Sequence, residues 1–235
     1  MKRRVVLTRE PPLNDELAAA LRGRAKVRVV SLTTTEFRNP TLVAAELSRH
    51  PMRGKFETIA VTSARAAPYA AMALTFAAPN AVLGAVGKAT LERLTAEGAV
   101  QPGRTISVPD DANAAALGEL IERGPVLALT ADTPRPELRS AVAEKGLFYD
   151  AVVCYNTVIV VPDRAQQRQL RKADVVVIAA PSAWRAARED VRADATVVTL
   201  GATTAGAVRM DHANVRVANS TQLVDVVLEV LGASN

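Results

Sequence analysis

Short β-branched runs alternate with helix-length stretches rich in Ala and Leu along almost the whole chain. Such runs are typical of buried strands of roughly 4–6 residues. Parallel strands need a long connection between them, and that connection is usually a helix. The pattern therefore predicts an α/β protein with parallel sheets flanked by helices. The predicted strands are residues 5–8, 27–30, 58–61, 82–86, 105–108, 126–129, 151–155, 175–178, 196–200 and 215–217.

The length of the chain and two irregular segments indicate two domains. The 235 residues are more than one open sheet needs and suffice for two domains of roughly 100 residues each. Residues 31–35 are polar and β-prone and have no helix directly after them, and residues 156–161 extend a strand beyond its normal length. We expect these two segments to pair as a two-stranded β linker. The first domain then comprises residues 1–34 plus 162–235, and the inserted second domain comprises residues 35–161.

Composition argues against several classes of function. The formal charge is +5, but the basic residues are spread along the chain, without zinc-finger spacing or an aromatic platform for stacked bases. We therefore expect no nucleic-acid partner, and a generally solvated basic surface is the simple alternative. Cys154 is the only cysteine, which excludes an internal disulfide and a cysteine metal cluster. His50 and His212 are the only histidines and lie far apart in sequence, so no metal site is expected.

Targeting and nucleotide-binding motifs are also missing. The apolar run after the basic N-terminus is only Val5-Val6-Leu7, too short for an export signal, and no apolar stretch is long enough to span a membrane. We expect a cytoplasmic monomer without a membrane partner. Neither a dinucleotide-binding glycine motif, a phosphate loop nor a nucleophile elbow occurs. A cofactor-free reaction or simple binding remains.

The chain contains an internal similarity. Val61-Thr62-Ser63-Ala64-Arg65-Ala66-Ala67 resembles the segment 180–187, Ala-Pro-Ser-Ala-Trp-Arg-Ala-Ala, and each follows a predicted strand and opens a helix. A glycine before a threonine-containing helix follows in both cases, at Gly87 and Gly201. The two halves are then related units. A chance match between two Ala-rich helices is the alternative.

Ser63, Ser182, Gly87 and Gly201 share one predicted setting, the carboxyl end of a strand where a helix begins. Ligands of open parallel sheets bind beyond such ends. The helix start offers free N–H groups, a serine offers a hydroxyl, and glycine lets a ligand approach the backbone. The set predicts a ligand with many carboxylates. Taken singly, the serines are equally well interpreted as ordinary N-caps and Gly201 as a tight turn.

At these positions the sequence resembles the uroporphyrinogen-III synthase family. Six short motifs occur in family order: Val6-Leu7-Thr8-Arg9, Thr62-Ser63-Ala64-Arg65-Ala66, Val86-Gly87-Lys88-Ala89-Thr90, Tyr155 two residues before Thr157, Pro181-Ser182-Ala183, and Gly201-Ala202-Thr203-Thr204-Ala205. There are two departures. Ala179-Ala180 replaces a hydroxyl residue that often precedes Pro-Ser, and Pro134-Arg135 replaces a Gly-Arg turn in the 130–136 loop.

The resemblance implies two α/β domains, one inserted in the other and joined by a β-ladder, with the active site between them. The family substrate is hydroxymethylbilane, a linear tetrapyrrole with eight carboxylates. The reaction needs no metal or organic cofactor. It eliminates water, inverts the last pyrrole ring through a spiro intermediate and closes the macrocycle, so the enzyme is a hydro-lyase.

The resemblance also supplies candidate site residues. Tyr155 is the catalytic candidate, which helps the hydroxyl group leave by donating a hydrogen bond or proton, since a phenol stays protonated at neutral pH. The alternative is a buried strand tyrosine with a structural role. The predicted substrate-binding residues are Arg9, Thr62, Ser63, Arg65, Gly87, Lys88, Thr90, Ser182, Gly201, Thr203 and Thr204.

Two other functions fit the same residues. A non-enzymatic two-domain binder or sensor of an anionic small molecule would use the same strand ends and close like a hinge. The second alternative is a member of the family that has lost its catalytic activity. The altered 130–136 loop is the only sequence feature that indicates such a loss. Both predict tetrapyrrole binding without an isomer-specific product.

Overall fold

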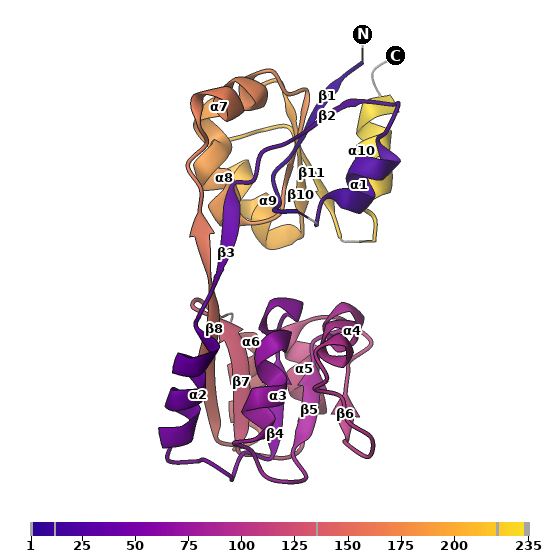
Figure 1. The fold of residues 1–235 in the computed structure, drawn as a ribbon. Helices are drawn as coiled ribbons and strands as arrows, with labels where there is room; N and C mark the ends of the chain where they lie inside the picture. Colours follow the sequence, from indigo (N-terminus) through magenta and orange to yellow (C-terminus); the bar gives the residue numbers. More distant parts are fainter. Residues whose placement is uncertain (1, 12, 135, 220, 233–235) are drawn as a thin grey trace. The chain divides into compact units, whose positions relative to one another are not determined.

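The structure, a computed structural model, describes residues 2–11, 13–134, 136–219 and 221–232. The chain divides into two compact units, residues 1–34 with 158–235 (unit 1) and residues 35–157 (unit 2). Each unit is a sheet with helices on both faces (Figure 1). No helix among the described residues is long and apolar enough to cross a membrane.

Unit 1 contains a five-stranded sheet in the order β11-β10-β9-β1-β2, and every neighbouring pair is parallel. Its strands are β1 (Arg4–Leu7), β2 (Lys26–Val29), β9 (Val175–Ile178), β10 (Thr196–Leu200) and β11 (Val215–Ala218). Its helices are α1 (Asp15–Ala20), α7 (Arg164–Arg171), α8 (Pro181–Ala187), η2 (Arg188–Asp190), α9 (Ala202–Arg209) and α10 (Leu223–Gly232).

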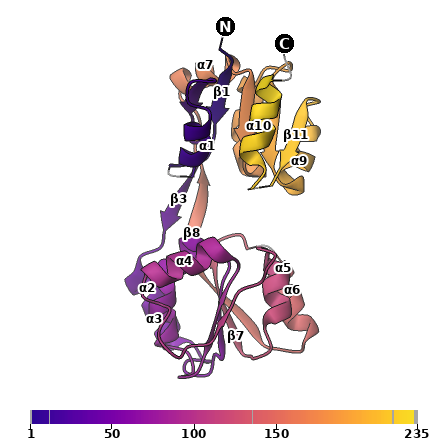
Figure 2. The same cartoon turned by 90° about the vertical axis from the view of Figure 1, so that its right-hand side faces the viewer.

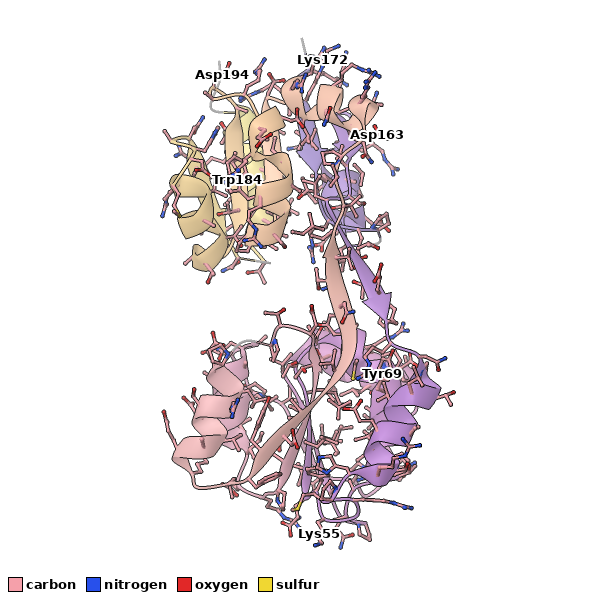
Figure 3. The ribbon with its side chains drawn as sticks, turned by 90° about the vertical axis from the view of Figure 1, so that its left-hand side faces the viewer. Lys55, Tyr69, Asp163, Lys172, Trp184 and Asp194 are labelled. Atoms are coloured by element: carbon pink, nitrogen blue, oxygen red, sulfur yellow. The ribbon has the colours of Figure 1, made fainter. Side chains whose placement is uncertain are left out.

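Alternating side chains of the strands in unit 1 supply two cores. Val5 and Leu7 face α1 and α10, whereas Val6 faces α7, α8 and α9. Trp184 of α8, labelled in Figure 3, is buried in the second of these cores. Strands buried on both faces consist almost entirely of apolar residues, which explains why these strands were visible in the sequence.

Unit 2 contains a six-stranded sheet in the order β3-β8-β7-β4-β5-β6. Its strands are β3 (Thr33–Phe37), β4 (Thr58–Val61), β5 (Val82–Ala85), β6 (Ile106–Ser107), β7 (Val126–Ala131) and β8 (Tyr149–Ile159). One face carries α2 (Pro40–Arg49), η1 (Ala64–Tyr69), α3 (Ala70–Leu74) and α4 (Lys88–Ala96), and the other carries α5 (Ala114–Leu120) and α6 (Glu137–Glu144) (Figure 2).

The segments around β3 and β8 lie beside each other. The backbone N–H of Arg38 donates to the Cys154 carbonyl, and that of Val160 donates to the Leu32 carbonyl, each at 2.9 Å. Because the partner numbers rise along one strand and fall along the other, these two segments run antiparallel. In unit 2 the hydroxyl of Tyr69 also donates to the Arg38 carbonyl, at 2.5 Å, and holds the end of β3 against η1 (Figure 3).

The two sheets share one spatial arrangement of five strands, although the chain passes through these strands in a different sequence and unit 2 adds β3. In unit 1 the sheet places β9, β10 and β11 on one side and β1 and β2 on the other, and in unit 2 it places β4, β5 and β6 on one side and β7 and β8 on the other. The strand order therefore reverses between β9 and β1 and between β4 and β7. The predicted class, two α/β domains with parallel sheets flanked by helices, is confirmed.

Candidate active site at the strand ends

The two reversals of strand order mark the candidate site of each unit. Ligands of open α/β sheets bind beyond the carboxyl ends of the strands at such a point. In unit 1 the Thr8 hydroxyl, after β1, donates to the Val177 carbonyl of β9 at 2.6 Å. In unit 2 the Thr62 hydroxyl, after β4, donates to the Leu129 carbonyl of β7 at 3.2 Å. A threonine thus ties the two strands together at each reversal.

Ser63 begins the first helix after the reversal in unit 2. It has extended backbone dihedrals and caps η1, because its Oγ accepts a hydrogen bond from the Arg65 N–H at 3.2 Å. The N-cap interpretation of Ser63 is confirmed. A cap uses the hydroxyl oxygen as an acceptor only, so the O–H proton is still able to donate to a carboxylate.

Ser182 occupies a different place in unit 1. Helix α8 begins at Pro181 after the N-cap Ala180, and Ala180 makes no side-chain cap. Ser182 is therefore the second residue of the helix, and its interpretation as an N-cap is wrong. The reason is Pro181, whose fixed φ and missing N–H suit the first helical position. By distance from the strand, the counterpart of Ser63 is Ala180.

Gly87 lies between β5 and α4, and Gly201 lies between β10 and α9, and the two glycines are needed for different reasons. Gly87 is extended, and a Cβ added there would lie 2.6 Å from the Ala112 Cβ. Gly201 has φ +81° and ψ 161°, and a Cβ added there would meet no other atom within 4 Å in the part of the chain that the structure describes. Dihedrals of this kind are essentially restricted to glycine. Gly87 therefore serves close packing, whereas Gly201 serves a turn that leaves open space in front of α9.

The predicted threonines and lysine of α4 and α9 differ in how far they are exposed to solvent. Thr90 and Thr204, each the third residue of its helix, are buried, and the Thr204 hydroxyl donates to the Ala179 carbonyl at 3.4 Å. Thr203 is exposed, and the Lys88 side chain is 88% exposed and lies 3.9 Å from Glu92. Thr203 and Lys88 are therefore accessible to a ligand, whereas Thr90 is buried and Thr204 ties the start of α9 to Ala179.

Arg9 lies at the reversal of unit 1 in a loop that is fastened to α1. One terminal guanidinium nitrogen donates to the Leu13 carbonyl at 3.2 Å. The Arg9 carbonyl accepts hydrogen bonds from the Ser31 hydroxyl, at 3.3 Å, and from the Asn14 side-chain amide. The backbone of the Thr8-Arg9 turn is thereby held from two directions, which positions the guanidinium group.

Tyr155 and Arg65, far apart in sequence, meet in unit 2. The Tyr155 side chain is only 5% exposed, and the Arg65 guanidinium carbon lies 6.0 Å from the centre of its ring. The centre of the Phe37 ring lies 6.3 Å from the centre of the Tyr155 ring. The Tyr155 backbone carbonyl accepts a hydrogen bond from the Asp132 N–H at 3.0 Å. This burial agrees with a structural role for the ring, and the catalytic role of its hydroxyl stays a prediction.

Cys154 precedes Tyr155 but is not a candidate nucleophile. The thiol is buried and donates to the Val152 carbonyl at 3.6 Å, and burial raises the pKa of Cys154 to about 12. A thiol that stays protonated at neutral pH is a poor nucleophile. Within the described ranges no group of three His, Cys, Asp or Glu residues is able to hold a metal ion. Arg135, in the altered 130–136 loop, lies outside these ranges.

Sequence reasoning missed several residues that shape the site. It did not assign the strand tie to Thr8, nor the support of Arg9 to Ser31 and Asn14. It also missed Thr130, one strand position before the end of β7, whose buried hydroxyl has no hydrogen-bond partner among the described residues. The available signal was a polar residue at the end of a predicted strand for Thr8, and directly after a predicted strand for Ser31.

Comparison with known proteins identifies a family by sequence and a similar fold by structure. A family model described as uroporphyrinogen-III synthase HemD matches residues 15–225. No curated protein is similar enough in sequence to match. The fold resembles two solved structures, a mutant uroporphyrinogen III synthase of the extremely thermophilic bacterium Thermus thermophilus (16% identity, TM-score 0.62, 98% of each chain) and the uroporphyrinogen-III synthetase of Helicobacter pylori (16% identity, TM-score 0.64, 97% of this chain and 99% of that one).

Proposed function

This chain belongs to the uroporphyrinogen-III synthase family, and from that premise we propose that it converts hydroxymethylbilane to uroporphyrinogen III. The observation that carries the proposal is the family match over residues 15–225, nearly the whole chain. The activity makes the chain an enzyme of heme biosynthesis with a small tetrapyrrole substrate. In finer terms we propose a hydro-lyase, because ring closure releases the terminal hydroxyl as water. The expected cytoplasmic location and monomeric state stay predictions.

Carboxylate binding is assigned to the strand ends of both units. Unit 2 contributes the Ser63 hydroxyl, Arg65 and Lys88, and unit 1 contributes Arg9 and the exposed Thr203. Each charge-assisted hydrogen bond to an acetate or propionate group contributes about 1.5–3 kcal/mol. Gly201 keeps the start of α9 open to the substrate, and Gly87 lets the start of α4 pack closely against Ala112. Thr90, Ser182 and Thr204 complete the predicted binding set. A set of five or more such groups suits a ligand with eight carboxylates.

Thr62 is a weak member of the predicted binding set, as is Thr204, whose hydroxyl is likewise directed at a carbonyl. The Thr62 hydroxyl proton is directed at the Leu129 carbonyl, which leaves the oxygen with acceptor capacity only. An ionised carboxylate also only accepts, so the two groups do not complement each other. We assign Thr62 to the strand tie and expect its effect on the substrate to be indirect.

Positioning is the main catalytic task in this proposal. The substrate closes spontaneously to the unrearranged isomer, so the enzyme must favour the rearranged product over a competing reaction. A hundredfold preference corresponds to about 2.7 kcal/mol between the two transition states. Holding the linear substrate in a curled geometry supplies such a difference without a conventional catalytic triad.

Tyr155 is proposed to assist departure of the hydroxyl group. It donates a hydrogen bond or proton from its phenol as the C–O bond breaks, and water leaves. The Arg65 guanidinium group, 6.0 Å from the ring centre, orients the tyrosine, and the neighbouring Phe37 ring helps to hold the tyrosine ring in place. General acid assistance of this kind typically contributes 10²–10⁴-fold in rate, on the order of 3–5 kcal/mol.

A coupled assay tests the function. Hydroxymethylbilane is generated in situ, the full chain is added, and the oxidised products are separated into type I and type III isomers. Predominantly type III product is the expected result. Type I product alone, from protein whose fold is verified by circular dichroism, would overturn the proposal and favour the non-enzymatic binder, which uses the same strand ends.

A further inference from the structure

A groove in unit 1, away from the strand ends, gathers basic side chains. It has a volume of about 420 Å³ and lies between the β1–β2 side of the sheet and α7. Lys172, directly after α7, is labelled in Figure 3. We call this feature the basic groove and define it by Arg4, Lys26, Arg28, Arg168, Gln169 and Lys172.

The fold explains why these side chains converge. The parallel register pairs Arg4 with Lys26 and Val6 with Arg28, so the four side chains share one face of the sheet. Val6 is buried against the helices of that face, which identifies it as the face covered by α7. Helix α7 and the residue after it supply Arg168 and Lys172, four positions apart. Because β2 is the edge strand, the groove stays open on one side.

The described part of the chain supplies no carboxylate ion-pair partner to the cations of the groove. Among the described residues, no ion pair includes any of its five cations, whereas nearby Arg171 pairs with Asp190 at 2.7 Å. Asp174 is close, but it accepts from the backbone N–H of Arg4 at 2.7 Å and from Arg192. The chain has 29 Lys and Arg, and removing these five leaves 24, which equals the number of Asp and Glu. The groove therefore holds cations equal in number to the net charge of +5.

Gln169 provides a second, independent observation. Its Oε1 is buried and has no hydrogen-bond partner among the described residues. A buried acceptor without a donor is unfavourable by about 1–3 kcal/mol. Because Gln169 lines the groove, a rotation of its amide would bring Oε1 to a ligand with a hydroxyl or N–H group. The cations alone would bind any anion. The amide oxygen of Gln169 favours an anion that also carries a hydrogen-bond donor.

From these observations we propose that the basic groove binds a small polyanion with two or more carboxylate or phosphate groups and a hydroxyl or N–H donor. None of the described residues that line the groove is aromatic, so these residues lack the stacking surface that single-stranded nucleic acid uses. Basic residues on an edge strand also prevent unwanted sheet pairing. That role accounts for Lys26 and Arg28 of β2, but not for Arg168 and Lys172 on the helix side.

The test uses the full chain and three probes: citrate, tricarballylate, which lacks the hydroxyl of citrate, and inorganic pyrophosphate. Binding is measured by isothermal titration calorimetry at low salt. We expect a dissociation constant below about 1 mM for citrate or pyrophosphate, and the tighter of the two distinguishes a carboxylate ligand from a phosphate ligand. The double variant Arg28→Gln/Arg168→Gln should weaken binding by about tenfold or more.

Controls separate the groove from general charge and from the strand ends. Arg49→Gln/Arg209→Gln removes the same charge at exposed sites outside the groove and should leave binding unchanged. Citrate should bind more tightly than tricarballylate, and Gln169→Met should abolish that difference. Absence of binding, equal losses in the control variant, or a loss in Lys88→Gln instead would overturn the proposal. The groove variant should still form type III isomer, so failure of the groove and failure of the synthase function are distinguishable.

Discussion

The two units share the spatial order of their parallel strands and the layers of helices around them. They nevertheless hold different chemical groups at corresponding strand ends. Where the first helix after the reversal begins, unit 2 has the capping Ser63 and unit 1 has Ala180 followed by Pro181. The tie across the reversal also differs, because the donor belongs to β1 in unit 1 and to β4 in unit 2. The sheet topology therefore fixes where a ligand is bound, whereas single residues decide what each place contributes.

The largest difference between the units concerns a single tyrosine. Unit 2 has Tyr155 on β8, next to the reversal strand β7, and the corresponding strand of unit 1, β2, ends with Val29. We expect Tyr155→Phe to lower turnover by about 10²-fold or more with little change in substrate binding, because only the hydroxyl is lost. Single-turnover formation of type III isomer measures this effect.

Tyr149→Phe is the matched control, since Tyr149 is the first residue of the same strand and burial raises the pKa of its phenol. This variant should keep normal turnover. Unaltered turnover in Tyr155→Phe would remove the tyrosine from the mechanism and leave unit 2 with a purely structural aromatic. An equal loss in both variants would indicate damage to β8 and not to the chemistry.

Two buried threonines, one in each unit, should respond to the same substitution with opposite signs. Thr8→Val leaves the buried Val177 carbonyl without its 2.6 Å donor and should destabilise unit 1 by about 1–3 kcal/mol. Thr130→Val replaces a buried hydroxyl that has no partner among the described residues and should leave unit 2 unchanged or stabilise it by up to about 1 kcal/mol.

Hydrogen exchange read separately for the amides of each unit measures these two changes, because the units need not unfold together. Destabilisation by both variants would mean that Thr130 has a partner such as an ordered water, and the contrast between the units would disappear. Stability unchanged in Thr8→Val would show that the strand tie of unit 1 contributes nothing net.

The sequence predicted the fold class well and the details of the site less well. Strands such as β1 and β9 are buried on both faces, so their runs of Val, Leu and Ile were unambiguous. The internal similarity aligned Ser63 with Ser182 by letters, although the helix starts align Ser63 with Ala180. Identical residues in two Ala-rich helices do not show which positions correspond in space, whereas the first residue of each helix does.

Tertiary contacts were beyond the reach of sequence patterns. Nothing in the spacing of Arg65 and Tyr155 predicts that one covers the ring of the other, because the contact depends on the order of β4, β7 and β8 in the sheet. The basic residues also looked evenly spread along the chain, and only the β1–β2 register and α7 bring five of them together. Such groupings follow from topology, which a single sequence specifies only indirectly.

The paired glycines give a further contrast, of similar size but different origin. Gly87→Ala should cost about 1–3 kcal/mol, because the new Cβ overlaps Ala112 at 2.6 Å. Gly201→Ala should also cost about 1–3 kcal/mol, because alanine resists φ +81° with ψ 161°. An additional substitution, Ala112→Gly, should restore the stability lost in Gly87→Ala and should not restore the stability lost in Gly201→Ala. Urea unfolding followed unit by unit measures the cycle, and a rescue in both backgrounds would contradict the assignment.

The smallest effect separates the two serines. Ser63→Ala removes a cap whose Oγ accepts from the Arg65 N–H at 3.2 Å, and it should destabilise unit 2 by about 0.5–1 kcal/mol. Ser182→Ala removes a hydroxyl that caps nothing in α8, so the stability of unit 1 should change by less than about 0.5 kcal/mol. If both serines bind substrate, both variants raise the KM for hydroxymethylbilane, and only Ser63→Ala also lowers stability. A variant Ser182→Ala with normal KM would remove Ser182 from the binding set and make the carboxylate sites of unit 1 depend on Arg9 and α9 alone.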